Sequence, residues 1–365
     1  MKKAFLLLLI SFTIVLVSCG NSKTNNPLEN EVTGEIEPPF RFVLNDDGYV
    51  VYCNDLNVEN ITIPNKFKEK DVVAIGEEGF ADCVNLKSVV IPESIKNIGD
   101  FAFVGCTSLI SVTIHNGVEN IGYGAFYDCS SLESIIIPES VSSIEESAFY
   151  HCANLKHFTI SDNVEIVGDL VFFGCDSLIY NECQNGKYLG NEENPYVILM
   201  SILDKDITSF DINSNCKIIY DQVFYECTNL TNIELPNSIT CIGKSAFYSC
   251  EKLISIKLSE GIKSIGKFSF SQCYQLENII IPEGLVRIGY SAFTGCNNLK
   301  SIVIPNSVTS IEEITFLGCE KLETVFNNSD IEVVAGDKYY KIPDTTKVYN
   351  KGEWSYIDGI PTPNK

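Results

Sequence analysis

Cysteine recurs in this chain at a constant interval, and that interval constrains the fold more than any other feature. The recurrence accompanies a phrase that reads C-x-x-L-x-x-[IVF]-x-[IL]-P-x-x-[VIL]-x-x-I-G-x-x-A-F-x-x-C. Self-similarity at a period of about 20–50 residues indicates a repeat protein, in which each unit packs on the next. Two series of cysteines are each spaced by 23 residues: Cys83, Cys106, Cys129, Cys152 and Cys175, then Cys227, Cys250, Cys273, Cys296 and Cys319.

Each part of the phrase has its own structural expectation. Val89 and Ile91 alternate with other residues, which predicts a short strand with one buried face. Pro92 ends that strand because it has no N–H for the ladder. The segment that carries Phe103 and Cys106, three residues apart, favours one tight helical turn. One such coil cannot bury its own apolar residues, so the coils must stack into a single elongated body.

The phrase resembles leucine-rich repeats, and most closely the BspA-like family of surface lipoproteins, over about residues 60–326. The resemblance implies an α/β solenoid, a right-handed coil with a parallel β-sheet on one face and short helical turns opposite. It also implies a surface or secreted protein of the adhesin type. The implied ligands are host extracellular matrix proteins or another microbe.

The first residues have the composition of an export signal. Two lysines precede the apolar run 4–17, which is shorter than the roughly 20 residues of a membrane span. The run ends in Leu-Val-Ser-Cys19, similar to the lipobox of bacterial lipoproteins, which implies a lipid on Cys19. Residues 1–18 are then the signal peptide and 19–39 a flexible tether to the cell envelope, either the outer membrane or the cell surface. An ordinary signal peptide that ends in cysteine is the alternative.

The rest of the chain divides into coils, two caps and an interruption. Two alternating strands, 40–44 and 49–53 around an Asn-Asp-Asp-Gly turn, predict an N-terminal cap over 40–75. The coils follow over 76–182 and 216–326. Residues 183–215 are expected to form an irregular insert, either a binding feature or a structural splice. For 327–365 we expect a C-terminal cap, whose Tyr349, Trp354 and Tyr356 either cover the last coil or form an aromatic patch.

Charge and motif content exclude several functions. The formal charge of −22 disfavours nucleic acid as a partner. No paired C-x-x-C cluster, glycine-rich phosphate loop or nucleophile motif occurs, so no metal, cofactor or enzymatic activity is expected. The periodic cysteines are expected to be buried free thiols, because stacked side chains point in parallel, which disulfide geometry disfavours.

Binding is expected on the outward positions of the strands, on the concave sheet. An exposed apolar stripe can mark an interface, although β-propensity alone also favours Val, Ile and Thr there. The alternatives are a structural or antigenic surface protein without a specific ligand and a carbohydrate-binding accessory lipoprotein. The candidate residues are Val90, Thr113, Ile136, His157, Thr159, Glu234, Lys257, Ile280 and Val303.

Overall fold

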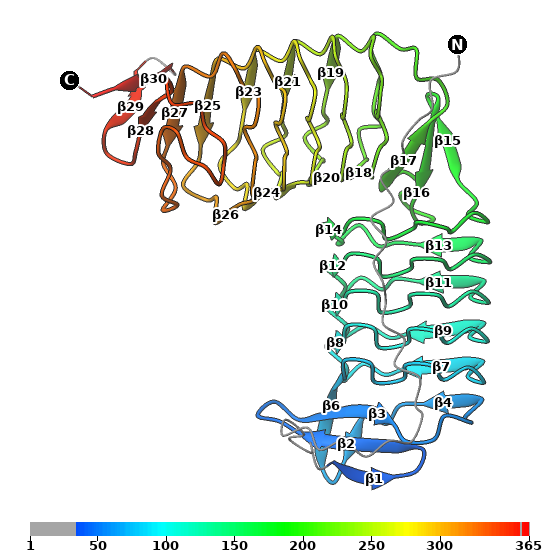
Figure 1. The fold of residues 1–365 in the computed structure, drawn as a ribbon. Helices are drawn as coiled ribbons and strands as arrows, with labels where there is room; N and C mark the ends of the chain where they lie inside the picture. Colours follow the sequence, from blue (N-terminus) through cyan, green and yellow to red (C-terminus); the bar gives the residue numbers. More distant parts are fainter. Residues whose placement is uncertain (1–33, 358–359, 365) are drawn as a thin grey trace, which may run out of the picture. The chain divides into compact units, whose positions relative to one another are not determined.

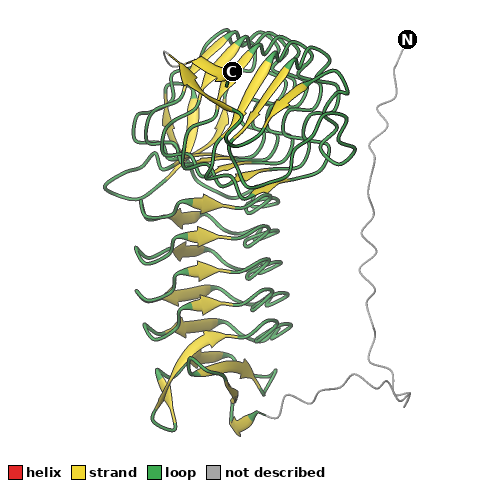
Figure 2. Cartoon of the chain, turned by 90° about the vertical axis from the view of Figure 1, so that its left-hand side faces the viewer, coloured by secondary structure: helices red, strands yellow, loops and turns green. Residues whose placement is uncertain are grey.

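The computed structural model describes residues 34–357 and 360–364, and these residues wind into a parallel β-solenoid (Figures 1 and 2). Each regular coil has a long strand of three or four residues and a short strand of two. Successive strands alternate between a long-strand sheet and a short-strand sheet. Strand partners in adjacent coils are 23 positions apart, as in Ser88 with Ser111 and Asn97 with Asn120. The prediction of a stacked 23-residue coil is therefore confirmed.

The coils form a first and a second stack, separated by a junction that we define as residues 176–217 (Figure 1). The long strands of the first stack are β4 (Asn60–Thr62), β7 (Ser88–Ile91), β9 (Ser111–Ile114), β11 (Ser134–Ile136) and β13 (His157–Thr159). Its short strands are β8 (Asn97–Ile98), β10 (Asn120–Ile121), β12 (Ser143–Ile144) and β14 (Ile166–Val167).

The second stack repeats this arrangement after the junction. Its long strands are β19 (Asn232–Glu234), β21 (Ser255–Lys257), β23 (Asn278–Ile280), β25 (Ser301–Ile304), β27 (Thr324–Asn327) and β28 (Lys347–Tyr349). Its short strands are β18 (Ile218–Ile219), β20 (Cys241–Ile242), β22 (Ser264–Ile265), β24 (Arg287–Ile288) and β26 (Ser310–Ile311). The long-strand sheet thus continues through β28, inside the range expected to be only a cap.

The turn segments of the coils are not helical, which corrects the prediction of short helical turns. Between Gly76 and Cys83, every second N–H bonds to the carbonyl three residues back, and the N–H groups between them bond to the next coil. Glu78 and Asp82 have φ of 52° and 54°, in the left-handed region. A helix requires consecutive internal bonds and right-handed backbone, so this alternation excludes one. No helix occurs in the described part of the chain (Figure 2).

One phenylalanine per coil forms a column of stacked rings along the core. In the first stack the ring centroids of Phe80, Phe103, Phe126 and Phe149 follow one another at 5.2 Å. The second stack has the same column from Phe224, with spacings from 5.0 to 6.0 Å. These rings are fully buried, and each inner ring of a column is stacked between the rings of the two adjacent coils. Burial of one ring therefore depends on both neighbouring coils.

The periodic cysteines have a polar role beside this column. The thiol of Cys106 donates a hydrogen bond to the carbonyl oxygen of Phe80 in the preceding coil, at 3.1 Å. A cysteine side chain is apolar enough to be buried in the core, and its S–H group can still donate a hydrogen bond. It therefore gives the buried carbonyl a further hydrogen-bond partner. The same bond to the preceding coil's phenylalanine is made by Cys129, Cys152, Cys175, Cys250, Cys273, Cys296 and Cys319.

The N-terminal cap has the two strands that the sequence predicts, β2 (Phe40–Leu44) and β3 (Tyr49–Cys53), paired antiparallel. They join β5 (Lys66–Phe67) and β6 (Lys70–Ile75) and cover the first coil. A further strand, β1 (Glu35–Glu37), pairs with β2. This strand lies inside the range 19–39 that was expected to be a tether.

The junction and the C-terminus contain the antiparallel hairpins. In the junction region, β15 (Asn181–Cys183), β16 (Gly186–Leu189) and β17 (Ile198–Ile202) pair in sequence, as expected for a hairpin at the insert. At the C-terminus β29 (Trp354–Ile357) pairs with β30 (Ile360–Pro363).

Candidate functional site

The outward positions of the long strands are occupied as the alternation predicts. In β9 and β11 the burial pattern alternates between exposed and buried residues. Ile136 in the first stack is 66% exposed and Ile280 in the second stack is 71% exposed, the highest values among the large apolar side chains. Two isoleucines are therefore in water on the face that the sequence indicates.

The candidate residues do not form a single strip, because they divide between two separate sheets. Val90, Thr113, Ile136, His157 and Thr159 lie on the sheet of the first stack, and Glu234, Lys257, Ile280 and Val303 lie on that of the second. No strand pairing joins β13 to β19 among the described residues. The expectation of one continuous strip is corrected on this point.

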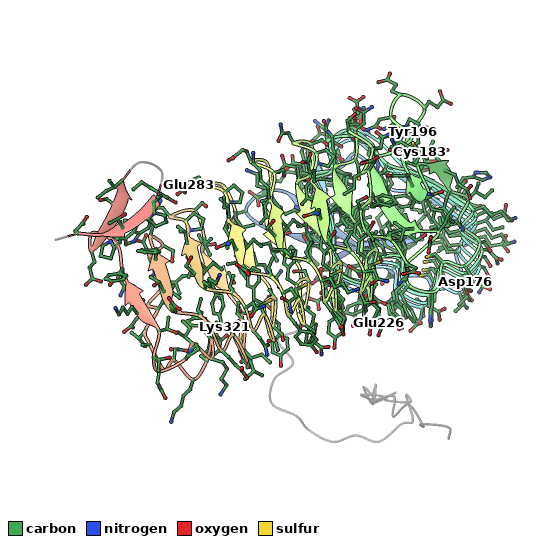
Figure 3. The ribbon with its side chains drawn as sticks, turned by 90° about the horizontal axis from the view of Figure 1, so that it is seen from above. Asp176, Cys183, Tyr196, Glu226, Glu283 and Lys321 are labelled. Atoms are coloured by element: carbon green, nitrogen blue, oxygen red, sulfur yellow. The ribbon has the colours of Figure 1, made fainter. Side chains whose placement is uncertain are left out.

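Within each sheet the register brings the candidates side by side. Ile136 is paired with Thr159, and in the second stack Glu234, Lys257 and Ile280 are consecutive partners. This second row combines an acid, a base and an exposed isoleucine over three adjacent coils. Charged residues flank this row. Lys300 Nζ lies 2.7 Å from the Glu277 carboxylate, and the hydrogen bond that it donates lowers the pKa of Glu277. Other charged side chains, such as Glu283 and Lys321, are also exposed on this stack (Figure 3).

At the C-terminal end of the second stack, aromatic side chains cover the outward column that contains Val303. Val303 is the register partner of Phe326, which is the partner of Tyr349. Phe326 is only 7% exposed, because the Tyr349 ring stacks on it at 5.5 Å and the Trp354 ring lies at 5.2 Å. Tyr356 remains 58% exposed. Of the three C-terminal aromatics, two thus cover the end of the sheet, and the third faces water.

A pocket lies where the two stacks meet, and none of the candidate residues lines it. Its volume is about 650 Å³, and its walls come from β14 on one side and from β20, β22 and β24 on the other. The hollow is therefore bordered by the short-strand sheets, whereas the sequence assigned the concave surface to the long strands. Its charged lining residues are Glu145, Glu146, Glu165, Asp169, Lys263, Lys267 and Arg287.

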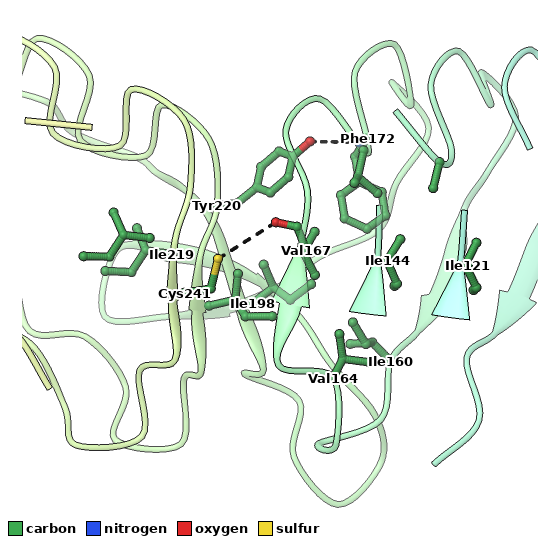
Figure 4. Packing of buried hydrophobic residues seen from close by; sticks show 14 of the residues in the cluster. Ile121, Ile144, Ile160, Val164, Val167, Phe172, Ile198, Ile219, Tyr220 and Cys241 are labelled. Carbon is green, nitrogen blue, oxygen red and sulfur yellow. Dashed lines mark hydrogen bonds between the residues drawn. The ribbon is translucent and has the colours of Figure 1, made fainter. Parts of the chain in front are cut away.

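Side chains replace a missing coil at this junction (Figure 4). The N–H of Leu170 donates to the Asp221 carboxylate at 2.7 Å, and the N–H of Phe172 donates to the Tyr220 hydroxyl at 2.8 Å. In a regular coil the equivalent N–H groups bond to carbonyls of the next coil. Cys241 Sγ lies 3.9 Å from the Val167 carbonyl, a much longer contact than the thiol bonds inside the stacks.

Partly buried charged side chains lie beside these bonds. Lys267 Nζ lies 3.1 Å from Glu146 and 3.2 Å from Asp169, so one ammonium links two carboxylates of the other stack. Burial raises the pKa of Asp221 to about 7, and the negative charge of Asp169 adds to the effect. Burial also raises the pKa of Asp169, against the influence of Lys267. Lys267 of the second stack therefore forms ion pairs with two carboxylates of the first stack.

Sequence reasoning located the interruption but missed Tyr220, Asp221 and Lys267. The available signal was at one position of the phrase: Tyr220 stands where other coils have a glycine or a glutamate, such as Gly243 or Glu145. A bulky aromatic at that position indicates that the neighbouring coil is not of the regular form. Among residues 34–357 and 360–364, no group of side chains suited to a metal ion occurs.

Some expectations lie outside the described residues. Cys19 and the signal segment are among them. None of the described segments is a helix of the length and apolarity required to cross a bilayer.

Comparisons with known proteins agree with the repeat. The model of the BspA type leucine rich repeat region matches residues 48–179 and 203–335, in six copies. No curated protein matches the chain. Among solved structures, a leucine rich cell surface protein from Faecalibacterium prausnitzii is 28% identical, with 80% of this chain and 94% of that chain covered and a TM-score of 0.39.

Two further structures are similar in the same way. A leucine-rich repeat protein from Bacteroides ovatus is 25% identical, with 87% and 99% coverage and a TM-score of 0.40. The pneumococcal vaccine antigen PcpA is 20% identical, with 88% and 94% coverage and a TM-score of 0.40. The family model covers more than half of this chain. With its repeat, its stacked coils and this match, the chain belongs to the BspA-type leucine-rich repeat family, a family of bacterial surface proteins.

Proposed function

We propose that this protein is tethered to the bacterial cell envelope by a lipid and binds another protein through the long-strand sheet of its second stack. The observation that carries the proposal is Ile280, which is 71% exposed in a row with Lys257 and Glu234. An apolar centre with a charged rim is the usual anatomy of a protein interface. Host matrix proteins or proteins of a neighbouring cell are the partners we propose.

The C-terminal hairpin supports this choice of face. Trp354 already packs on Phe326, at the end of the column that contains Val303 and Ile280. The sheet thus accepts an aromatic side chain from a segment outside the coils, and the next positions of the column are open. For carbohydrate binding we would expect aromatic platforms on the outward strand positions. The outward row of the second stack instead has Glu234, Lys257 and Ile280, which favours a protein ligand.

The test compares substitutions on the face with one on a turn segment of the same stack. Ile280→Lys combined with Val303→Lys should weaken binding to immobilised host matrix proteins at least tenfold, because each places an ammonium in the apolar centre. Leu317→Lys is the matched control, because Leu317 is 44% exposed on a turn segment of the same stack. Circular dichroism would show that all variants remain folded.

Two results would contradict the proposal. Equal binding by the double variant and the wild type would move the interface away from this face. If the wild type binds no protein of a broad extracellular panel, a structural or antigenic role without a specific ligand is favoured.

The tether is tested separately, because it depends on the pattern before Cys19. Cys19→Ala should leave an uncleaved precursor or release the protein from the membrane fraction. Unchanged cleavage and membrane retention would show that the segment acts as an ordinary signal and that another feature holds the protein.

A further inference from the structure

The pocket between the stacks contains apolar side chains at positions that are polar in other coils. In the first stack the outward position of the short strand is an asparagine or a serine in three successive coils, and in the next coil it is Ile166, which lines the pocket. In the second stack the residue before the short strand is a lysine or a threonine in the other coils, and at the pocket it is Val286. Ile166 is 39% exposed and Val286 is 44% exposed. Each wall of the pocket therefore presents an apolar side chain to water.

Contacts between the stacks hold the two walls of this pocket in place. The Thr240 hydroxyl donates to the backbone carbonyl of Glu165 at 3.2 Å. Lys267 pairs with Glu146 and Asp169 of the other wall. Because the protein makes these contacts by itself, the pocket is formed without a ligand, which is usual for small-ligand sites. Its volume of about 650 Å³ also lies within the range of roughly 300–1,000 Å³ for such sites.

Two charged side chains of the pocket lack a partner in the part of the chain that the structure describes. The Glu165 carboxylate and the Lys263 ammonium make no ion pair or hydrogen bond there. The other basic groups are occupied, because Lys267 pairs with the first stack and Arg287 with a glutamate of its own stack. The Glu145 carboxylate accepts a hydrogen bond from a neighbouring serine. The pocket therefore has an unpaired negative charge on the first-stack wall and an unpaired positive charge on the second-stack wall.

We propose that this pocket binds a short apolar peptide by its two free ends. The α-ammonium of the peptide pairs with Glu165, and its α-carboxylate pairs with Lys263. Its side chains cover Ile166 and Val286 and remove them from water, which is favourable for apolar surface. The peptide site is separate from the protein-binding face proposed above, because none of the residues of that face lines the pocket.

The charges and the lining of the pocket disfavour other classes of ligand. A phosphate ester carries only negative charge, and the four acidic side chains of the pocket would repel it. A sugar is uncharged and packs on aromatic faces, whereas the described lining contains one aromatic residue, Tyr123. A free amino acid has both charges attached to one carbon atom, whereas Glu165 and Lys263 belong to different walls. A peptide with free ends combines separated charges of both signs with apolar side chains.

The experiment titrates trileucine into the full chain by isothermal titration calorimetry at neutral pH. The chain carries Cys19→Ser, so that no lipid can be attached at that position. We expect saturable binding of one peptide per chain and a higher melting temperature, because a ligand that binds only the folded state stabilises it. Trileucine amide and N-acetyl-trileucine should each bind about tenfold more weakly, because each leaves one charged side chain of the pocket without its partner. Triglycine should also bind more weakly, because it has no side chain to cover Ile166 and Val286.

Two variants assign the ends of the peptide. Lys263→Gln should weaken trileucine binding about tenfold and leave the affinity for trileucine amide unchanged, because the amide has no carboxylate to pair with Lys263. Glu165→Gln should weaken trileucine binding to a similar extent and leave the affinity for N-acetyl-trileucine unchanged. Lys252→Gln is the matched control, because Lys252 is an exposed lysine of the second stack outside the pocket. Thermal melting without peptide would show that all three variants remain folded.

The inference is wrong if trileucine does not bind saturably, or if its amide and N-acetyl forms bind as tightly. It is also wrong if Lys263→Gln or Glu165→Gln weakens all three peptides equally, because the side chain would then act on the shape of the pocket and not on one end of the ligand. Equal binding of triglycine and trileucine would show that the apolar walls have no part in recognition and would exclude an apolar peptide as the ligand.

If a variant does not fold, the comparison of the peptide forms on the unsubstituted chain decides the question alone. None of these readouts depends on the long-strand face, so loss of matrix-protein binding and loss of peptide binding are distinguishable.

Discussion

Two kinds of interface hold this solenoid together, one inside the stacks and one at the junction. Inside a stack the N–H of Phe126 donates to the Ala148 carbonyl of the next coil at 2.8 Å, backbone to backbone. At the junction the N–H of Phe172 makes a bond of the same length to the hydroxyl of Tyr220. The donor is unchanged, but the acceptor has changed from backbone to side chain.

The difference shows what a repeat needs from its neighbour. Each coil needs hydrogen-bond acceptors for the N–H groups that point toward the next coil, and it needs an aromatic ring that packs against its phenylalanine. Any part of the chain can supply these groups. At the junction Asp221 and Tyr220 supply the acceptors, and the Tyr220 ring lies 5.5 Å from the Phe172 ring at a tilt of 60°, where the coils inside a stack have nearly parallel rings. The hydrogen bonds are thus retained while the parallel stacking of rings is lost, so we expect the junction to be the weaker interface.

The largest expected effect is the loss of a central ring. Phe126→Ala should lower the free energy of unfolding by about 3–5 kcal/mol, because it leaves a cavity between two coils. Phe172→Ala at the junction should cost less, since its ring is 6% exposed and meets the Tyr220 ring at a tilt rather than lying between two parallel rings. Urea denaturation measures both. Equal losses would mean that the two interfaces are equally well packed.

A smaller effect is expected from one hydroxyl. Tyr220→Phe leaves the buried N–H of Phe172 without its acceptor, which costs about 1–3 kcal/mol. In a nearest-neighbour array, weakening one interface lets the parts on either side unfold separately. We therefore expect the denaturation curve to broaden or to divide into two transitions. Tyr248→Phe, whose hydroxyl is in a regular coil and bonds to the Gln272 side chain, is the control. A single unbroadened transition in Tyr220→Phe would show that the junction is not the weak point.

A further effect is expected on the pH dependence of stability. The folded-state pKa of Asp221, about 7, lies above the unfolded value near 3.9, so between these values the folded chain binds a proton that the unfolded chain releases. Stability should therefore fall as pH rises from about 4 to about 7 and then level off. Asp169 shifts in the same direction. In Asp221→Asn the decline, followed by thermal melting, should be shallower; an unchanged slope would assign it to other groups.

Much of the fold could be predicted from the sequence, because the same residues recur at one interval. The strand positions, the inward cysteines and the two cap strands β2 and β3 all follow from local alternation and turn residues. The helical turn was wrong because Phe103 and Cys106 are spaced as on a helix, while backbone bonds to the next coil decide the conformation. Spacing within one coil does not contain that information.

The sites were less predictable for a related reason. Outward positions such as Ile136 and Ile280 follow from alternation, so their exposure could be anticipated. The junction depends on contacts such as that of Lys267 with Glu146, which are 121 positions apart and have no periodic signal.

The alternation of N–H groups in the turn segments has a consequence for evolution. Every coil offers its successor the same set of donors and receives the same set from its predecessor. A duplication or deletion of one whole repeat therefore leaves no donor without an acceptor, whereas a change of any other length disrupts the register. Duplication of whole repeats can therefore lengthen a stack in steps of about 4.8 Å, the spacing of adjacent strands.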